Sequence, residues 1–377
     1  MLITDIEHID RAEWETLLSV SPVATWFQSP EAYRFFASMP DLMTPFVCAV
    51  LRETEQSRHR SITVVSPQYH RTIKNTPDSH LSRGEGQEER LVGLVVGYIT
   101  KEKNPVRQFF TRRAVIYGGP LLAEDITEEE LTELLTMVNS QLSNKSIFIE
   151  TRNFNDYSPW RTTFEKAGFL YQPHLNFHVD TTSLELVNLN LGKNRKRDIR
   201  VSLRDGARIV ENPALEQVRS YYSILLSLYQ TKVRTPLFPW EFFERLYSLP
   251  SSCFLLVEYQ GEIIGGTVCV VLSGKTVYEW FVCGEDGKYK NIFPSELATY
   301  AGLKFATENG CTCFDMMGAG TPEEHYGVRD FKARFGGQLI EHGRFLRVNR
   351  SILYNLGKFG VSVIRSRGGA SSCKSRY

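Results

Sequence analysis

Apolar positions follow strand-like and helix-like spacings in turn, and the pattern is clearest in the second half of the chain. Thr276 to Cys283 is β-branched and aromatic, as in a buried strand, and Pro294 to Glu308 carries apolar residues at helical spacing before ending at Asn309-Gly310. Cys311 to Met317 then returns as a strand that leads into a glycine-rich loop. This order predicts a crossover unit whose ligands bind near the helix N-terminus and the carboxyl end of the following strand.

The first half shows the same succession of patterns. Leu91 to Thr100 and Ala114 to Leu122 are expected to be strands, followed by a helix over Thr127 to Leu142 that opens with a capping box. Ser146 to Glu150 is a further expected strand, and a short helix follows it. The two halves therefore share one order of elements, although their residue identity is faint.

Glycine spacing supports this correspondence. Gly97 and Gly168 are 71 residues apart, as are Gly266 and Gly337 (168 − 97 and 337 − 266). Equal spacing within the same order of elements predicts a duplicated α+β unit. We therefore expect two tandem domains, each a mixed central sheet flanked by helices.

The expected domains are residues 1–180 and residues 181–377. Residues 52–90 are polar and basic, so we interpret them as an insertion or a long hairpin, with Ile62 to Val65 as a short strand. In the second domain, Leu339 to Val348 is expected to form one strand before an amphipathic helix, and the tail is expected to be frayed from about residue 367.

Composition places the chain among ordinary soluble proteins, with 42% hydrophobic and 23% charged residues in 377. A net charge of +1 gives no global attraction to nucleic acid or anionic membranes. The seven cysteines show no metal-like pairing, which favours reduced, structural thiols. Met1 to Glu7 does not resemble a signal peptide, and no apolar run approaches the ~18 residues that span a bilayer. We expect a cytoplasmic protein.

Several catalytic motifs are absent from the sequence. There is no Gly-x-x-x-x-Gly-Lys-Ser/Thr phosphate loop, no strand-linked Gly-x-Gly-x-x-Gly and no Gly-x-Ser-x-Gly elbow. The histidines are too scattered to predict a metal site.

Two candidate residues lie near the glycine-rich loop. Lys332 is flanked by aromatic residues, so its ammonium could bind a phosphate or a developing oxyanion; the alternative is a solvated helix face. Asp315 lies in a strand expected to be buried, where a carboxylate must find a partner. A general base, an orienting group and a structural ion pair are all open for Asp315.

Two positive segments are candidate anion sites. Gly192 to Arg200 is the densest basic cluster, and a helix would place Arg197 and Arg200 on one side. The alternative is a solvent-facing basic helix. The loop Gly287 to Ser295 opens the central helix, where backbone amides, the helix dipole, Lys288 and Lys290 favour an anion.

Together these segments resemble one family. The positions concerned are Tyr278-Glu-Trp280, Pro294, Leu297, Phe305-Ala306, Gly310, Phe314-Asp315, Gly318, Phe331 to Gly337, the basic stretch Asn194 to Arg200 with Gly206, and, in the first half, Tyr117 to Leu121. This pattern is similar to the FemAB-like branch of the GNAT acyltransferase superfamily, which includes the peptidoglycan-bridge aminoacyltransferases.

The resemblance implies two tandem GNAT-like domains and transfer of an activated acyl or aminoacyl group to an amine, with a cell-envelope precursor as the acceptor. The donor would be a co-substrate, aminoacyl-tRNA or an acyl thioester, and neither a metal nor a tightly bound cofactor is expected. By motif, Lys332 would lie near the transferred carbonyl and Asp315 at the strand end facing the cleft. The expected substrate-binding residues are Arg195, Arg197, Arg200, Tyr278, Lys290 and Arg334.

The chain departs from the family pattern at two points. The Gln/Arg-x-x-Gly-x-Gly/Ala pyrophosphate loop of coenzyme A-dependent members is absent from Gly287 to Ser295, and the second half has no long charged helical hairpin of the kind that could engage tRNA. Two alternatives stay open. One is an N-acyltransferase of small amines that depends on coenzyme A or a carrier protein; the other is a non-catalytic RNA or glycan-phosphate binder that uses the Lys193 to Arg200 helix.

Overall fold

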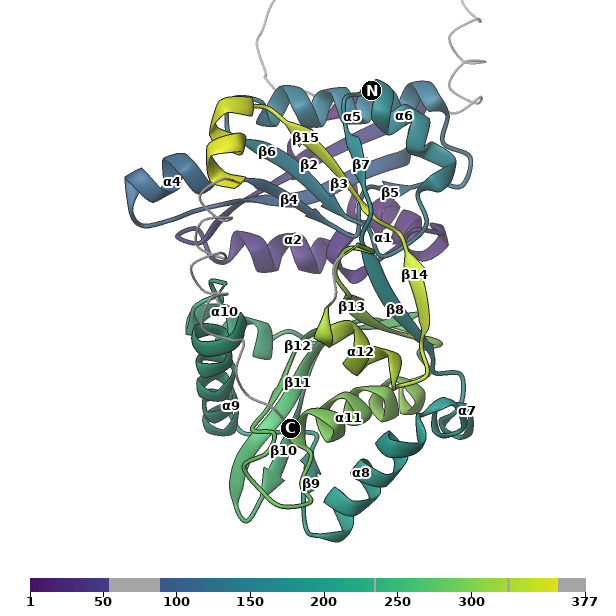
Figure 1. The fold of residues 1–377 in the computed structure, drawn as a ribbon. Coiled ribbons are helices and arrows are strands. Elements are labelled where there is room, and N and C mark those ends of the chain that lie inside the picture. Colours follow the sequence, from purple (N-terminus) through teal and green to yellow (C-terminus); the bar gives the residue numbers. More distant parts are fainter. Residues whose placement is uncertain (54–88, 234, 324–325, 359–377) are drawn as a thin grey trace, which may run out of the picture.

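The computed structural model describes residues 1–53, 89–233, 235–323 and 326–358 (Figure 1). Most of the polar insertion, with the expected strand at Ile62 to Val65, and the tail from residue 359 lie outside the described residues. Among the helices that the structure describes, none is both long and apolar enough to cross a membrane.

The first sheet belongs to the upper half of the molecule in Figure 1. Its strands are β1 (Leu2–Ile3), β2 (Met43–Glu53), β3 (Glu89–Thr100), β4 (Ala114–Tyr117), β5 (Leu121–Leu122), β6 (Phe148–Arg152), β7 (Leu170–Gln172) and β15 (Arg344–Val348). Their spatial order is β1-β2-β3-β4-β6-β15-β7, and β5 pairs with β3. The last strand in the described part of the chain, β15, thus lies inside the first sheet.

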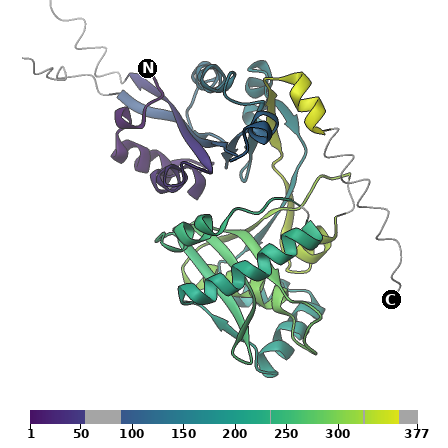
Figure 2. The same cartoon turned by 90° about the vertical axis from the view of Figure 1, so that its left-hand side faces the viewer.

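The second sheet belongs to the lower half. Its strands are β8 (Leu175–Asp180), β9 (Arg208–Val210), β10 (Ser252–Tyr259), β11 (Glu262–Leu272), β12 (Thr276–Gly284), β13 (Cys313–Gly318) and β14 (Gln338–Glu341). Their order is β14-β8-β13-β12-β11-β10-β9. Figure 2 shows the two sheets with their helices as an upper and a lower body joined at one side.

Helices flank both sheets. The first half contains α1 (Arg11–Val20), α2 (Pro30–Ala37), α4 (Pro105–Thr111), α5 (Glu128–Leu142) and α6 (Arg161–Lys166), with 3₁₀ turns η1 (Ile6–His8), η2 (Trp26–Gln28) and η3 (Ser158–Trp160). The second contains α7 (Leu184–Asn190), α8 (Lys193–Arg204), α9 (Leu215–Leu228), the π-helical η4 (Tyr229–Val233), α10 (Trp240–Tyr247), α11 (Pro294–Glu308) and α12 (Gly327–Ala333). Residues 351–358 are also helical.

The duplicated unit predicted from the sequence is present in both halves. β2, β3, β4, α5 and β6 in the first half correspond to β10, β11, β12, α11 and β13 in the second. In each series the first three strands are antiparallel neighbours, and the helix crosses over to a parallel strand, β6 beside β4 and β13 beside β12. The prediction of an α+β fold with two mixed sheets is confirmed.

The two sheets exchange strands. β8 comes from the end of the first half yet lies between β14 and β13, and β15 comes from the end of the second half yet lies between β6 and β7. A division of the chain after residue 180 therefore does not follow sheet membership, and it remains a proposal. The exchange brings the beginnings of β8 and β15 together where the halves meet.

Two expected strands are broken by glycines. The prediction of one strand over Leu339 to Val348 is wrong, because Gly343 adopts φ 64° and separates β14 from β15. The prediction of one strand over Ala114 to Leu122 is also wrong, because Gly118 and Gly119 adopt φ 80° and 76° between β4 and β5. Positive φ values interrupt the extended backbone that a strand requires.

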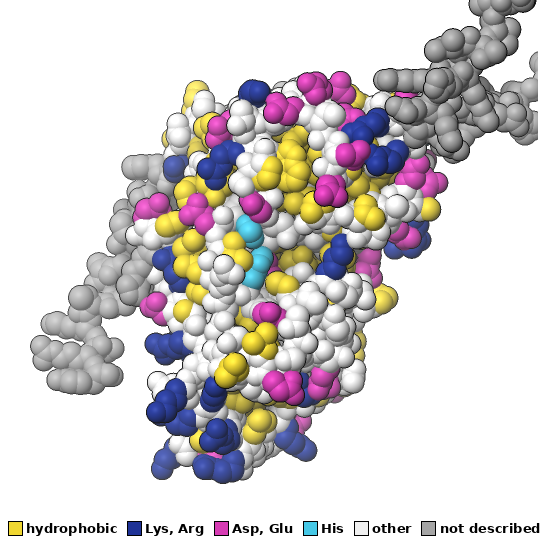
Figure 3. All heavy atoms as spheres, turned by 90° about the vertical axis from the view of Figure 1, so that its right-hand side faces the viewer, with side chains coloured by type: hydrophobic (Ala, Val, Ile, Leu, Met, Phe, Trp, Pro, Cys, Tyr) yellow, Lys and Arg dark blue, Asp and Glu magenta, His cyan; other side chains and the backbone are white. Residues whose placement is uncertain are grey.

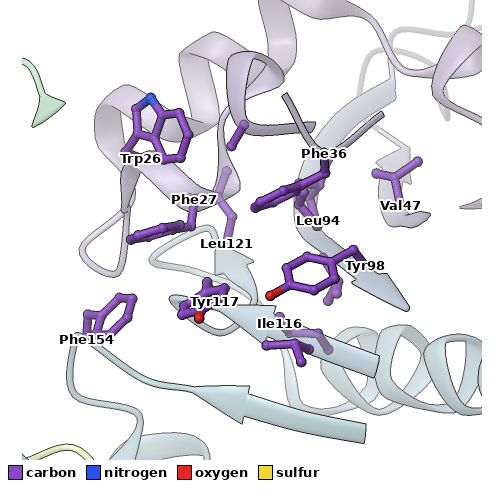
Figure 4. Close-up of a cluster of buried hydrophobic side chains, with 14 of the residues drawn as sticks. Trp26, Phe27, Phe36, Val47, Leu94, Tyr98, Ile116, Tyr117, Leu121 and Phe154 are labelled. Carbon is purple, nitrogen blue, oxygen red and sulfur yellow. The ribbon is translucent and has the colours of Figure 1, made fainter. Parts of the chain in front are cut away.

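An aromatic cluster joins the two halves. Phe27 is fully buried, and its ring centroid lies 5.0 Å from Tyr117 in the first half, 5.5 Å from Tyr278 and 5.0 Å from Trp280 in the second. Figure 4 shows first-half members, among them Phe27, Tyr117 and Phe154, and the ring centroids of Phe27 and Phe154 are 5.4 Å apart. Because these rings form one core with the second half, the relative placement of the sheets is set by side-chain packing.

Candidate active site

The candidate site is an opening in the second sheet. The parallel pairing of β12 with β13 begins at Thr276 and Cys313 and ends at Tyr278 and Asp315, although both strands continue. The strands separate beyond that point, at the carboxyl end of β13. This is the part of a crossover unit where the sequence pattern predicted a ligand site.

Lys332 closes this opening with a buried ammonium group. Its Nζ donates hydrogen bonds to the backbone carbonyls of Met316, Gly318 at 3.0 Å and Met317 at 3.3 Å. Burial lowers the pKa of Lys332 below its ordinary value, and the negative charges of Glu279 and Asp315 oppose that shift only in part. Helix α12 thus places the Lys332 ammonium group at the carboxyl end of β13.

The backbone conformation of Met317 orients these carbonyls toward Lys332. It adopts φ 56°, a left-handed conformation that residues other than glycine rarely take, and its amide donates to Asp315 Oδ1 at 2.6 Å. The register of β13 against β8 also shifts between Asp315 and Gly318. Strained backbone of this kind gathers at functional sites, and here it forms part of the lysine cage.

Glu279 is a second buried carboxyl group beside Lys332. It is 3% exposed, Oε1 lies 3.4 Å from the Thr267 hydroxyl, and Oε2 has no hydrogen-bond partner among the described residues. Burial raises the pKa of Glu279 to about 7, with the charge of Lys332 acting in the opposite direction. We did not select Glu279 from the sequence, although an acidic residue within an otherwise apolar strand was a usable signal.

His178 lies on the other side of Asp315. Its Nε2 is 3.1 Å from Asp315 Oδ2, and its ring centroid is 5.3 Å from that of His342. Burial lowers the pKa of His178, but the hydrogen bond and the charge of Asp315 outweigh burial, so the net pKa is raised above 6.5. Figure 3 shows histidine side chains at the surface where the upper and lower halves meet.

A matching ionic network occupies the first sheet. Glu150 accepts hydrogen bonds from Arg152 Nε and Arg344 Nη1, each at 2.9 Å; Arg152 also donates to the Tyr117 hydroxyl, and Arg344 to His174 Nε2. Burial raises the pKa of Glu150, but the two arginines outweigh it and hold that pKa at about 2. Burial, reinforced by Arg344, lowers the pKa of His174 to about 3. These ion pairs link β6 to the exchanged strand β15.

The structure brings together three of the residues predicted from the sequence. Asp315 and Tyr278 are register partners on neighbouring strands, both are buried, and Lys332 lies where their strands separate. The buried Tyr278 hydroxyl has its pKa raised, first by burial and then by the charge of Asp315. Its ring belongs to the aromatic cluster between the halves.

Arg195 lies elsewhere. It is 4% exposed, forms an ion pair with Glu296 of α11, and holds its guanidinium carbon 4.7 Å from the centre of the Phe331 ring. Phe331 directly precedes Lys332, but the lysine points to β13 while Arg195 is enclosed with α11. Its expected role in substrate binding remains a prediction.

Four other predicted binding residues are exposed. Arg197, Arg200, Lys290 and Arg334 have exposed side chains, and Arg197 pairs with Asp198 at 2.8 Å. The Lys332 ammonium is buried, so the structure does not gather these cations around it. Their part in substrate binding also remains a prediction.

Two open recesses on the described surface lie away from the cluster. One lies between α2 and α10 and includes Arg34 and Arg245; the other lies beside α4. Neither is lined by Lys332, Asp315 or His178. The chemistry-bearing residues therefore gather at the strand opening and not in these recesses.

Comparisons with known proteins agree with this architecture. Residues 193–332 match the family model described as an acetyltransferase (GNAT) domain. The solved structure of FemX is similar to this chain with a TM-score of 0.64 and 13% identity, over 94% of this chain and 99% of FemX. A tandem GNAT protein from the clavulanic acid biosynthesis pathway gives a TM-score of 0.52 and 10% identity, over 93% and 98% of the two chains.

A third similar structure is the C-terminal domain of a putative lysylphosphatidylglycerol synthetase from Agrobacterium fabrum, with a TM-score of 0.50 and 13% identity over 70% of this chain and 84% of that one. A search of curated protein sequences found no match. The resemblance stated from the sequence motifs is thereby confirmed. Residues 193–332 match an acetyltransferase (GNAT) domain, and the whole chain has a fold similar to those of FemX and of a tandem GNAT protein.

Proposed function

We propose that this chain is an acyltransferase that moves an activated acyl or aminoacyl group onto an amine of a cell-envelope precursor. The observation that carries the proposal is the buried ammonium of Lys332 at the strand opening of the GNAT domain. The names of FemX and of the lysylphosphatidylglycerol synthetase domain support an aminoacyl group and an envelope acceptor.

Acyl transfer begins when a neutral amine attacks the carbonyl carbon of the donor. Negative charge then develops on the carbonyl oxygen, and a cation in a water-poor site stabilises it more strongly than bulk water does. Lys332 Nζ is such a cation. Its 3.3 Å contact with Met317 is longer than the contacts with Met316 and Gly318, so this is the contact that an oxyanion replaces most easily.

The start of α11 bears on the identity of the donor. Asp286 accepts hydrogen bonds there from the Ser295 amide at 3.1 Å and the Ser295 hydroxyl at 2.5 Å. A helix N-terminus attracts anions, but here the chain's own carboxylate already occupies it. This supports aminoacyl-tRNA as the donor over an acyl-CoA whose pyrophosphate would need that position.

We expect Asp286→Ala to lower the free energy of unfolding by about 0.5–2 kcal/mol, because an amide at the start of α11 loses its acceptor. Urea unfolding measures the change, and Asp41→Ala, an exposed aspartate outside any helix, is the control. Acetyl-CoA should stabilise neither the wild type nor the Asp286→Ala chain. Stabilisation that grows with the acetyl-CoA concentration would favour the alternative of a coenzyme A-dependent N-acyltransferase.

Turnover tests the proposal as a whole. The full chain is offered aminoacyl-tRNA, acyl-CoA or an acyl carrier thioester, together with nucleotide-linked muropeptide or small amines, and products are identified by mass. We expect an acceptor that has gained one aminoacyl group. Product from acyl-CoA alone would favour the coenzyme A alternative.

The non-catalytic alternative has one observation in its favour, the exposed side chains of Arg197 and Arg200 on α8. It predicts no product with any donor. It also predicts RNA binding that weakens steeply with salt and is lost in the Arg197→Gln/Arg200→Gln double variant.

A further inference from the structure

The site described so far lacks a proton acceptor for the attacking amine. A neutral amine that forms an amide loses one proton, and the Lys332 ammonium already carries its full complement. Glu279 does not meet the need, because its carboxylate is the strongest counter-charge of the buried Lys332 ammonium. The acceptor has to be a base that reaches the junction of the two halves.

His178 has the geometry of such a base. Asp315 Oδ1 is occupied by the Met317 amide at 2.6 Å, and Oδ2 faces His178 Nε2 at 3.1 Å. A carboxylate only accepts hydrogen bonds, so Nε2 carries the imidazole proton and Nδ1 keeps its lone pair. No hydrogen bond to Nδ1 is present among the residues that the structure describes.

Exposure separates the two members of this pair. The Asp315 side chain is 1% exposed, whereas that of His178 is 19% exposed. The imidazole can therefore meet a substrate while the carboxylate behind it stays out of water. Carboxylate, imidazole and substrate in that order is the arrangement that fixes a histidine tautomer for general base catalysis.

Lys332 and His178 are both attached to one short segment. The lysine binds the carbonyls of Met316, Met317 and Gly318, and the histidine binds the side chain of Asp315 directly before them. Tyr278 is the register partner of Asp315, and its ring contacts Phe27 of the first half. The cation therefore contacts the backbone of β13 at residues 316–318, and the base contacts the side chain of residue 315.

We propose that His178 is the general base of the acyl transfer and that Asp315 is the residue that positions it; this rests on the function proposed above. As the amine nitrogen forms its bond to the carbonyl carbon, Nδ1 of His178 takes the N–H proton. Asp315 stabilises the resulting imidazolium. The carbon–oxygen bond of an ester donor, or the carbon–sulfur bond of a thioester, then breaks, and the leaving atom takes that proton.

The charged surroundings of His178 set its pH dependence. Asp315 faces it from β13 and His342 from the turn between β14 and β15. Burial and the neighbouring His178 lower the pKa of His342, while Asp315 and Asp156 raise it less. His342 is therefore neutral near pH 7, and turnover should fall as pH drops through the raised pKa of His178.

The test compares His178→Gln and Asp315→Asn with wild type. Glutamine retains a donor towards Asp315 but offers no base, so kcat should fall about 100-fold with KM unchanged, and the acidic limb of the pH profile should vanish. In Asp315→Asn, kcat should fall and the acidic limb should move to lower pH. His8→Gln, whose exposed side chain lies far along the chain from the site, is the control.

The outcomes separate this inference from the proposed function. If wild type makes no product with any donor, both the proposed function and the assignment of His178 as the base are contradicted. If wild type is active and His178→Gln matches it with an unshifted pH profile, only the base assignment falls. Imidazole nitrogen NMR tests the assignment without substrate. In the neutral imidazole of wild type we expect the proton on Nε2, and in Asp315→Asn we expect a lower His178 pKa. A neutral wild-type imidazole with its proton on Nδ1 would overturn the assignment.

Discussion

Lys332→Met is expected to lower kcat about 1,000-fold, because the developing oxyanion loses a positioned donor in a water-poor site. Methionine retains the length of the side chain but carries no charge. The carbonyls of Met316, Met317 and Gly318 then lose their shared donor. Without the cation, the pKa of Glu279 should rise above its value of about 7.

The measurement is kcat with saturating donor and acceptor, together with the thermal unfolding of each variant. The control is Lys166→Met, because Lys166 ends α6, which lies in the place that corresponds to α12, and its side chain is 63% exposed. We expect the control to match wild type in kcat. Wild-type turnover by a folded Lys332→Met chain would remove Lys332 from the mechanism.

Glu150→Gln is expected to lower the free energy of unfolding by about 3–5 kcal/mol, the usual cost of removing one partner from a buried ion pair. The Glu150 side chain is 15% exposed and is the shared acceptor for Arg152 and Arg344. With glutamine, two largely buried guanidinium groups lose their counter-charge. Because Arg344 lies on β15, the loss also weakens the attachment of the exchanged strand.

Acid should reveal the same interaction. The pKa of Glu150 is held at about 2, below its ordinary value of 4.5, so its contribution is present above pH 4.5 and is lost as pH falls towards 2. Urea unfolding at several pH values measures this loss, which should be smaller in Glu150→Gln. The control is Glu241→Gln, whose pair with Arg245 is 45% exposed on both sides and should change stability by less than about 0.5 kcal/mol.

Much of the fold was predictable because it rests on local signals. The capping box of Thr127 with Glu130 marks the start of α5, and Ser29 followed by Pro30 marks that of α2. Gly206 lies just past the end of α8 and adopts φ 101°, as a glycine after a helix often does. Apolar spacing then distinguished strands from helices closely enough to show the duplication.

Strand exchange was not predictable in this way. The pairing of β15 with β6 joins residues almost two hundred positions apart, as in Arg344 with Glu150, and no local pattern encodes it. Such pairing decides which side chains meet at the junction. His178, His342 and Arg344 escaped notice because each has an ordinary local context and gains its partners only from the exchange.

The basic helix shows the same limit at the level of one side chain. The family resemblance implied that Arg195 binds substrate, which remains a prediction; its guanidinium pairs with Glu296, 101 residues further along the chain. Charge alone does not reveal which member of a basic cluster points inward. Lys332 was selected as a cation beside an apolar wall and is buried, but the carbonyl cage around it depends on the left-handed Met317.

The most direct test of the proposed site is a crystal structure with a stable analogue in which a tetrahedral phosphonate joins the acyl group to the acceptor. We predict a phosphonate oxygen about 2.7–3.1 Å from Lys332 Nζ, with the former contact to Met317 opened. The acceptor side of the analogue should lie next to His178. An analogue bound in the recess between α2 and α10 or in the one beside α4, with Lys332 still on its three carbonyls, would contradict the proposal.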